Sequence, residues 1–596
     1  MSRFTLRPIA ASLLFISSAV VAAEPPIIVT ATRTAQIADE SLAPVIVIDR
    51  TKIEQSQAVD IGDLLREHAG LDIGRNGGPG QPTSLFMRGT DSNHVLVMVD
   101  GVKINPGTIG GAALQNIDPE LIERIEIVKG PRSTLYGSEA VGGVINIITR
   151  RAAKGLDANA YLGAGRYETR KAGAGAHKGG DDYRAGFDVG YTKTNGFPTR
   201  TTSDIVSGYD NRSLNLYLGK HLSGVDLELS HWQAGGTSDY LDYTLAPLSQ
   251  DYANRVTELK VNAAPQDSWT TTLRLSRAVD NIDQNQSSDF AHTRRDSVDW
   301  QNNLQLTTEQ LLSAGLYASR EHISSISYGS GFGDNTKTKA LYAQDDLNLG
   351  PHRLLLAARH THHDAFGGHT TWDAEYGYHF TPHTRVSAAV GTAFRAPDAT
   401  DRFGYGGDPN LQAETSRNFE LGLHHQLSAR QSMALSVFDN RIKDLIEYDF
   451  SSNKMMNIGR ARIRGIEGSY DIKMRSWGAH IEAIVQSPKN EDSGKPLLRR
   501  AKRSLTASAF YDLGRYRFGA DWMLTSQRRD IDSNTFNYIY DAGYGLLNLT
   551  ALMHIDQQWT LQGRVENAAD KRYTLVDGYN TAERSLYVEL RYGYKG

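Results

Sequence analysis

Histidine side chains offer the clearest spacing for chemistry in this sequence. The stretch HTHHDAFGGH contains His360, His362, His363 and His369, and neighbouring imidazole nitrogens can bind a transition metal. A solvated polar loop would contain the same residues, and we keep it as the alternative. The chain has no cysteine, which excludes disulfide scaffolds and thiolate metal sites. Because no Ser-His-Asp set, carboxylate pair or phosphate-binding loop stands out, we expect neither an enzyme nor a catalytic cofactor.

The composition limits the class of protein. Hydrophobic residues make up 40% of the 596 residues, and the mean hydropathy is −0.43. Beyond one apolar run near the N-terminus there is no second long one, and a membrane-spanning helix needs roughly 20 apolar residues. These values exclude a helical membrane protein. The net charge of −4 gives no sign of a nucleic-acid partner.

The N-terminal segment has two features of an exported protein. Residues 1–23 combine Arg3 and Arg7 with an apolar run and small residues at its end, which predicts a secretory signal peptide. The next segment, residues 24–33 (EPPIIVTATR), contains consecutive β-branched residues, which favour a strand. No turn sequence follows that would fold this strand into a hairpin. We therefore expect an unpaired strand at the beginning of the mature chain.

Alternating sequences after residue 150 indicate the fold class. In YRAGFDVGYT, YRFGADWML and LYVELRYGY, apolar and aromatic residues occupy every second position, which is typical of strands with one apolar face. Residues 151–596 hold about 22 strands of membrane-crossing length, although about 20 or 24 fit nearly as well. We predict an all-β transmembrane fold, a 22-stranded antiparallel outer-membrane β-barrel with Tyr and Trp at the interfaces. A soluble sandwich is the alternative.

Residues 34–150 have a different pattern. IGDLLREHAGLDI predicts a short amphipathic helix that ends at a glycine, and HVLVMVDGVKI and IERIEIVKG predict compact buried strands. This segment is large enough for a core of its own, and a barrel of about 22 strands has a lumen that can hold it. We predict an N-terminal α+β plug domain inside the barrel. A separate soluble domain is the alternative, but no long flexible linker precedes residue 151.

Several of these segments resemble one family. IERIEIVKGPRSTLYGSEAVGGVINIIT is similar to the plug signature of TonB-dependent outer-membrane receptors, and PPIIVTAT resembles their energy-coupling box. NIGRARIRGIEGSY and NAADKRYT are similar to segments of the family's barrels. The resemblance covers essentially the whole mature chain. It implies a monomer surrounded by lipid in the outer membrane of a Gram-negative bacterium, with uptake driven by the inner-membrane TonB complex.

The resemblance also gives the N-terminal strand a partner. An exposed unpaired strand is a liability unless another chain pairs with it. TonB is expected to add its own strand by main-chain hydrogen bonds, which transmit a pull along the chain into the plug. A frayed terminus is the alternative. The predicted coupling box, or TonB box, consists of Ile27, Ile28, Val29, Thr30 and Ala31.

Within the family, three segments resemble the branch that takes up cobalamin (vitamin B12): NGGPGQPTS, DGVKINPGTIGG and PLLRRAKRSL. The branch implies active transport of cobalamin or a related corrinoid, bound by glycine-rich plug loops and by an arginine that contacts phosphate. The alternative is that these glycines only form turns and that the arginine only faces the lumen, with no role in ligand binding. A ferric siderophore or heme is the alternative ligand, and a passive porin is a weaker alternative function. The implied ligand contacts are Pro82, Ser84, Asp91, Ile109, Gly110 and Arg499.

The same branch uses calcium as a structural ion that orders extracellular loops. Loop carboxylates supply the hard oxygen ligands that Ca²⁺ prefers. The sequence offers Asp242 among its loop acids, but Arg212 stands where the branch has a denser acidic cluster. Solvated loop acids are therefore the alternative. The predicted calcium ligands are Asp210, Asp239 and Asp251.

Overall fold

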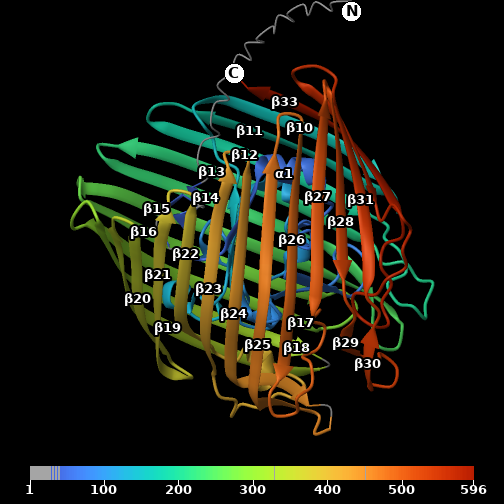
Figure 1. Ribbon diagram of the computed structural model, residues 1–596. Coiled ribbons are helices and arrows are strands. Elements are labelled where there is room, and N and C mark those ends of the chain that lie inside the picture. Colours follow the sequence, from blue (N-terminus) through green and yellow to red (C-terminus); the bar gives the residue numbers. More distant parts are fainter. Residues whose placement is uncertain are drawn as a thin grey trace, which may run out of the picture.

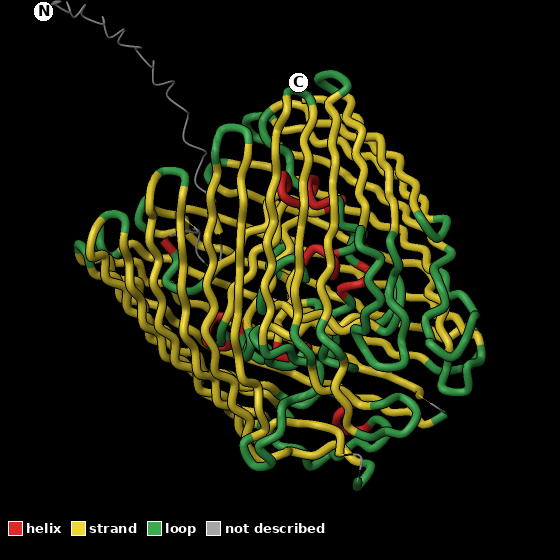
Figure 2. The backbone as a smooth tube through the Cα atoms, turned by 45° about the vertical axis from the view of Figure 1, so that its right-hand side comes forward, coloured by secondary structure: helices red, strands yellow, loops and turns green. Residues whose placement is uncertain are grey.

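The structure is a computed structural model that describes residues 28–29, 33, 36–37, 40–327, 329–449 and 451–595. The predicted signal peptide and Ile27, Thr30 and Ala31 of the coupling box lie outside the described residues. No helix of the described part of the chain is long and apolar enough to cross a membrane. One closed β-barrel surrounds a small α+β domain (Figures 1 and 2).

The barrel is a single closed antiparallel sheet in which β10 pairs with β33. Residues in register at this closure include Leu162 opposite Leu590. The predicted fold class, a 22-stranded antiparallel β-barrel, is confirmed for the described residues. The barrel strands are β10 (Gly155–Gly165), β11 (Thr169–Gly179), β12 (Tyr183–Thr194), β13 (Tyr209–Leu222), β14 (Val225–Leu241), β15 (Pro247–Gln266), β16 (Trp269–Gln284), β17 (Phe290–Gln305), β18 (Gln310–Ser327), β19 (Ser330–Leu349), β20 (His352–His363), β21 (Gly367–Thr381), β22 (Thr384–Arg395), β23 (Glu414–Ser428), β24 (Gln431–Asp449), β25 (Lys454–Lys473), β26 (Trp477–Asn490), β27 (Arg503–Leu513), β28 (Tyr516–Thr525), β31 (Tyr544–His554), β32 (Trp559–Glu566) and β33 (Ser585–Lys595).

Alternation along the strands separates a lipid face from a lumen face. On β12, Phe187 and Val189 are each 41% exposed, whereas Asp188 between them is 3% exposed. On β28, Trp522 is 48% exposed and Met523 is 4% exposed. The apolar residues at alternate positions therefore point outward, as a membrane barrel requires.

The two rims of the barrel differ in the length of their connections (Figure 2). Connections near the ends where β10 begins and β33 ends are short turns, such as 223–224 and 350–351. The opposite rim has long loops, as expected of the extracellular side. The long loops cover residues 195–208, 396–413 with α4 (Ala399–Phe403), 491–502, 526–543 with the hairpin β29 (Arg528–Ile531) and β30 (Tyr538–Asp541), and 567–584.

The plug contains a five-stranded sheet in the order β3-β8-β9-β6-β7, in which only β6 and β9 are parallel. A second hairpin joins β4 (Leu71–Arg75) and β5 (Thr83–Met87). The sheet strands are β3 (Val45–Asp49), β6 (Val95–Val99), β7 (Val102–Lys103), β8 (Ile122–Lys129) and β9 (Gly143–Thr149), and the helices are α1 (Arg50–Ser56), α2 (Ile61–Leu65), α3 (Ser133–Tyr136) and the 3-10 turns η2 (Ser92–His94), η3 (Leu114–Asn116) and η4 (Pro119–Leu121).

The observed helix in IGDLLREHAGLDI is shorter than the helix predicted from the spacing of its apolar residues. Asp60 caps α2 by accepting a hydrogen bond from Asp63 N, and α2 ends at Leu65. Gly70, four residues beyond the C-cap Arg66, has φ +80° and precedes the first residue of β4. The apolar residues Leu71 and Ile73 therefore belong to β4.

The core of the plug continues into the barrel wall. Ile125 and Ile145 are fully buried in one apolar cluster that also contains Trp232 and Val256 from β14 and β15. Figure 1 shows the blue plug segments within the barrel. The plug thus lies in the lumen as predicted, and the alternative of a separate soluble domain is wrong.

The N-terminal strand differs from the prediction of an unpaired strand. β1 (Ile28–Val29) pairs antiparallel with β2 (Gln36–Ile37), with Ile28 opposite Ile37. The connection between the two strands is longer than the tight turns whose sequences announce a hairpin. The sequence therefore contains no turn motif that predicts this pairing, and the expectation of an unpaired strand is wrong.

Candidate ligand-binding mouth and coupling segment

The first predicted plug loop, residues 76–82, joins β4 to β5 beneath the long outer loops. Gly77 and Gly80 have φ +117° and +76°. A Cβ added at Gly80 would lie 2.1 Å from the ring of Tyr209 on β13, so only glycine permits this approach. Gln81 Nε2 donates to Asp239 O at 2.7 Å. Pro82 beside it is exposed.

The second predicted loop, residues 100–111, contains β7, and its part after β7, residues 104–111, is held by one buried asparagine. Asn105 Oδ1 accepts from Val97 N at 2.8 Å, and its Nδ2 donates to Gly110 O at 2.8 Å. Ile109 is 50% exposed, although large apolar side chains are usually buried. A Cβ added at Gly110 would lie 2.8 Å from Asp398 Oδ2. The loop therefore presents Ile109 and backbone to the outer mouth.

The 3-10 turn η2 links the two loops. Ser92 Oγ accepts from Leu85 N at 3.2 Å, next to the predicted contact Ser84. On its other side, Asn93 Cβ lies 3.0 Å from the position of a Cβ on Gly110. Ser84, Asp91 and Gly110 thus lie around one turn of the plug, and their contact with a ligand remains a prediction.

An ion pair between Asp91 and Arg500 connects this apex to the barrel loops. Asp91 Oδ2 forms an ion pair with Arg500 Nη2 at 2.6 Å. Burial raises the pKa of Asp91, but Arg500 and then His94 outweigh it and hold that pKa below its usual range. The plug apex is therefore bound to Arg500, which the sequence prediction passed over in favour of its neighbour in the sequence PLLRRAKRSL.

Arg499 contacts other loops instead. Its Nε donates to Asp530 Oδ1 at 2.8 Å, and its side chain is 35% exposed. Asp530 is fully buried and also accepts from Ile531 N and Asp577 N. Arg499 has φ +61°, which is uncommon for a residue other than glycine. Asp530 thus joins three outer loops at the mouth, through Arg499 on one side and Asp577 on the other.

Ion pairs hold the plug against the wall below the mouth. Arg88 binds Glu420 at 3.0 Å and Glu467 at 2.5 Å. Plug residue Arg132 binds Glu375 at 2.6 Å, and plug residue Glu120 binds Arg591 at 2.6 Å. The carboxylate of Glu414 and the ring of His94 form a further buried pair. The two residues of each pair are far apart in the sequence, so no local sequence pattern could predict these ion pairs.

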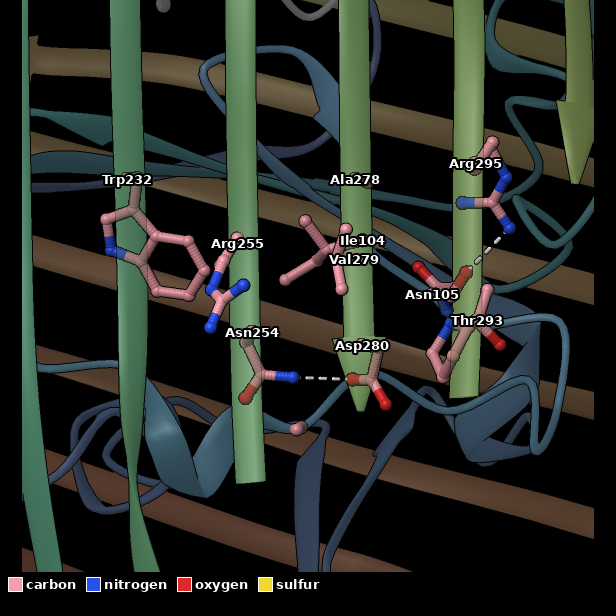
Figure 3. Close-up of a pocket in the computed structure, with 12 residues that line it drawn as sticks. Ile104, Asn105, Trp232, Asn254, Arg255, Ala278, Val279, Asp280, Thr293 and Arg295 are labelled. Atoms are coloured by element: carbon pink, nitrogen blue, oxygen red, sulfur yellow. Dashed lines mark hydrogen bonds between the residues drawn. The ribbon is translucent and has the colours of Figure 1, made fainter. Parts of the chain in front are cut away.

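The plug leaves only small gaps at the wall in the region of Figure 3. A cavity of about 20 Å³ lies between the second loop and β14–β17, which is room for about one water molecule. Asn254 Nδ2 donates to Asp280 Oδ2 at 2.6 Å, and Arg295 Nη2 donates to Asn105 O at 2.8 Å (Figure 3). Passage of a ligand there requires movement of the plug.

The coupling segment is fastened to the lumen wall at Arg33. The Arg33 guanidinium binds Asp299 at 2.7 Å and donates to the Tyr342 hydroxyl at 2.5 Å. Gln301 Nε2 donates to Arg33 O at 3.0 Å. Asp299 and Gln301 lie on β17 on the inner half of its course, which begins at the outer rim. A pull on β1 must therefore separate β1 from β2 and release this anchor.

The predicted calcium ligands lie on β13, β14 and β15 near the outer rim. Asp210 Oδ1 is buried without a hydrogen-bond donor, with Arg212 Nη2 at 3.8 Å. Asp239 accepts from Gly208 N at 3.2 Å, and Asp251 accepts from Thr237 Oγ1 at 2.6 Å. Among the described residues, Asp210, Asp239 and Asp251 are not gathered within 4.8 Å. Calcium binding by these three carboxylates remains a prediction.

The histidine cluster does not converge. His360 and His362 on β20 are exposed on either side of buried Thr361, so they face away from the lumen. His363 is the next residue after His362, so its side chain points to the other face of β20. His369 stacks on Phe394, with 4.6 Å between the ring centroids. In the part of the chain that is described, these residues form no metal-binding group. They lie on β20 and β21 rather than in the connection 364–366, so the polar-loop alternative is wrong as well.

A plugged outer-membrane barrel with a bound coupling segment defines a class of outer-membrane transporters. Two family models match this chain: the TonB dependent receptor-like β-barrel over residues 155–568 and the TonB-dependent receptor plug domain over residues 38–144. The chain belongs to the TonB-dependent receptors. It is therefore a protein of the outer membrane of Gram-negative bacteria that works with TonB and transports bound ligands.

Solved structures of low sequence identity share this fold. The FrpB iron transporter of Neisseria meningitidis (F3-3 variant) is 15% identical, with a TM-score of 0.80 over 92% of this chain and 99% of that chain. FpvA of P. aeruginosa bound to heterologous pyoverdines is 15% identical, with a TM-score of 0.82 over 95% and 88%. The siderophore receptor PirA of Acinetobacter baumannii is 17% identical, with a TM-score of 0.80 over 92% and 98%.

Proposed function

We propose that this receptor imports a compact metal chelate of low net charge, which binds on the plug apex and is moved inward by TonB. The observation that carries the proposal is the pairing of three mouth arginines with carboxylates, whereas Arg529 in the same region donates to Pro496 O and stacks on Tyr538. Arg499 is bound to Asp530, Arg500 to Asp91 and Arg402 to Asp334. A polyanionic ligand would have to compete with carboxylates for these cations.

The charge of the outer loops supports a ligand of low charge. In the long loops and the shorter outer connections, acidic side chains outnumber basic ones. A rim of net negative charge repels an anionic ligand as it approaches. A ferric tris-catecholate is therefore a poor candidate, whereas a neutral ferric hydroxamate or a corrinoid meets no such barrier.

Two ligand classes meet this requirement. The comparisons favour a ferric siderophore, because the names of the similar solved structures refer to iron transporters and siderophore receptors. The plug loops favour cobalamin or a related corrinoid, because their sequences resemble that branch of the family. The exposed Ile109 and the backbone around Gly110 suit the apolar and amide surfaces of either ligand. A passive porin is disfavoured by the plug that fills the lumen.

Binding titrations of the purified full-length protein distinguish these classes. The probes are cobalamin, a neutral ferric trihydroxamate and an anionic ferric tris-catecholate. We expect saturable binding of one of the first two and none of the third. Saturable binding of the tris-catecholate alone would overturn the low-charge proposal, and saturable binding of cobalamin would decide for the corrinoid.

Uptake into whole cells tests the energy coupling separately. Cells that express this receptor are compared with and without a functional TonB complex, and both binding and accumulation of the selected ligand are measured. We expect the same ligand binding in both kinds of cell, and accumulation only in the cells that have a functional TonB complex. Accumulation that continues without TonB would indicate passive passage.

A further inference from the structure

A histidine–carboxylate cluster lies where the plug contacts β26. His68 belongs to the plug segment between α2 and β4, and His480 and Glu482 lie two positions apart on β26. Among the described residues, these three form the group whose potential ligand atoms all lie within 4.8 Å of one another. β26 begins at Trp477 on the inner rim, so the cluster lies in the inner part of the lumen.

The distances in the cluster are close to those around a bound metal. Glu482 Oε1 lies 3.0 Å from His68 Nδ1 and 2.7 Å from His480 Nε2. Ligand atoms about 2.1 Å from a tetrahedral Zn²⁺ lie about 3.4 Å apart. Small side-chain rotations therefore convert the hydrogen-bonded cluster into three metal ligands.

A neighbouring carboxylate orients one of the rings. Asp471 Oδ1 lies 2.6 Å from His480 Nδ1, so it engages the ring nitrogen that points away from the cluster. Ala69 N donates to Glu482 Oε2 at 2.8 Å, which fixes that carboxylate and leaves Oε1 toward the histidines. A carboxylate behind a histidine ligand is the usual support of a metal-binding imidazole.

The charge around the cluster suits a cation. The side chains of His68, His480 and Glu482 are 11%, 27% and 7% exposed, so small ions can reach a site that is largely shielded. The nearby ammonium of Lys129 is held by Ala69 O at 3.1 Å and by Glu467 at 3.3 Å. Arg88 also binds Glu467, so these two cations are held by Glu467 while Glu482 and Asp471 face the histidines.

We propose that His68, His480 and Glu482 bind a divalent transition metal, with Zn²⁺ the preferred ion and water in the fourth position. Two imidazole nitrogens and one carboxylate oxygen form a ligand set typical of zinc. The bound ion would join the plug segment 66–70 to β26 and strengthen the hold of the barrel on the plug. The site lies away from the outer mouth, so the proposal is independent of which ligand is transported.

Cobalt spectroscopy on the full-length protein tests this site directly. The protein is purified in detergent with a tag that contains no histidine, and it is titrated with Co²⁺ and then with Zn²⁺. We expect saturable visible d–d absorption that Zn²⁺ abolishes. His68→Ala, His480→Gln and Glu482→Gln should each abolish the signal, and Asp471→Asn should weaken binding by about 10–100-fold.

His177→Gln is the matched control. His177 is also a buried lumen histidine paired with a carboxylate, Asp188 at 2.9 Å, but on β11, and its replacement should leave the cobalt spectrum unchanged. Each variant is first checked for a folded barrel by its heat-dependent electrophoretic migration. The proposal is overturned if folded wild-type protein gives no saturable signal, or if the signal survives all three ligand replacements.

Discussion

Replacing Arg88 tests whether buried ion pairs hold the plug in the barrel. The guanidinium binds both oxygens of Glu420 at 3.0 and 3.1 Å and Glu467 at 2.5 Å, and it lies 4.5 Å from the ring centroid of Phe438. Arg88→Met keeps much of the side-chain volume but leaves the carboxylates without their shared cation. Removal of one partner of a buried pair costs about 3–5 kcal/mol.

That cost predicts a measurable opening of the barrel. It shifts the equilibrium between docked and undocked plug by about two to four orders of magnitude, at about 1.4 kcal/mol for each factor of ten. Conductance of single proteins in planar bilayers measures the fraction of time in which the lumen is open. We expect frequent large openings in Arg88→Met and few in the wild type.

Two further variants separate the charge effect from a general loss of packing. Glu467 retains Lys129 as a partner at 3.3 Å, so Glu420 is the carboxylate left alone, and Arg88→Met with Glu420→Gln should recover most of the closure. Arg277→Met is the matched control, because Arg277 and its partner Asp296 lie on the outward faces of β16 and β17, away from the plug. Conductance of Arg88→Met equal to that of the wild type would refute the reasoning.

Four other outcomes are expected. Ile28→Pro removes a backbone donor and fixes φ in β1, so TonB-dependent accumulation should be lost with ligand binding retained, and unchanged accumulation would contradict the coupling assignment. Gly110→Val should lower ligand affinity by more than about tenfold, because its φ of +70° and the nearby Asp398 leave no room for a side chain, whereas Gly593→Val, with open space around it, should titrate like the wild type. Burial and then Asp530 raise the pKa of Asp541 to about 6 from 3.8. Asp541 therefore stabilises the folded β29–β30 hairpin most below pH 3.8, and this stabilisation is lost as the pH rises through 6. Hydrogen exchange of the hairpin amides, corrected for intrinsic rates, should show the loss in the wild type and not in Asp541→Asn. If calcium orders the outer loops, chelation should weaken ligand binding and alanine replacements should remove that effect, and equal affinity with and without calcium would exclude a role for Asp210, Asp239 and Asp251.

The barrel could be predicted because its signal is local. Phe187 and Val189 face lipid and Asp188 faces the lumen, so a short stretch of sequence already records both environments. The position of the plug followed from its compact strands and the absence of a long linker before residue 151. The pairing of β1 with β2 left no such record, because backbone hydrogen bonds between short strands place few demands on side chains.

The site was predicted less completely because its partners are distant in the sequence. The sequence PLLRRAKRSL predicted a contact at Arg499, but the ion pair of Arg500 with the plug depends on the position of Asp91 in the folded chain. The histidine cluster could have been corrected from sequence alone, since His360 and His363 fall on opposite faces of a strand. His68 and His480 gave no signal before the fold brought them together.

The ion pairs that lie beside the apolar contacts of the plug–wall interface help to explain how a tightly held plug can still be moved. Arg88, Arg132 and Glu120 make their strongest contacts with charged groups of the wall. When a pull on the N-terminal segment separates such a pair and water enters, each charge regains its hydration, which offsets much of the lost attraction. An apolar interface would regain nothing from water and would resist separation over its whole area. Ion pairs therefore give a seal that is specific and closed at rest, yet releasable under force once Arg33 has left Asp299.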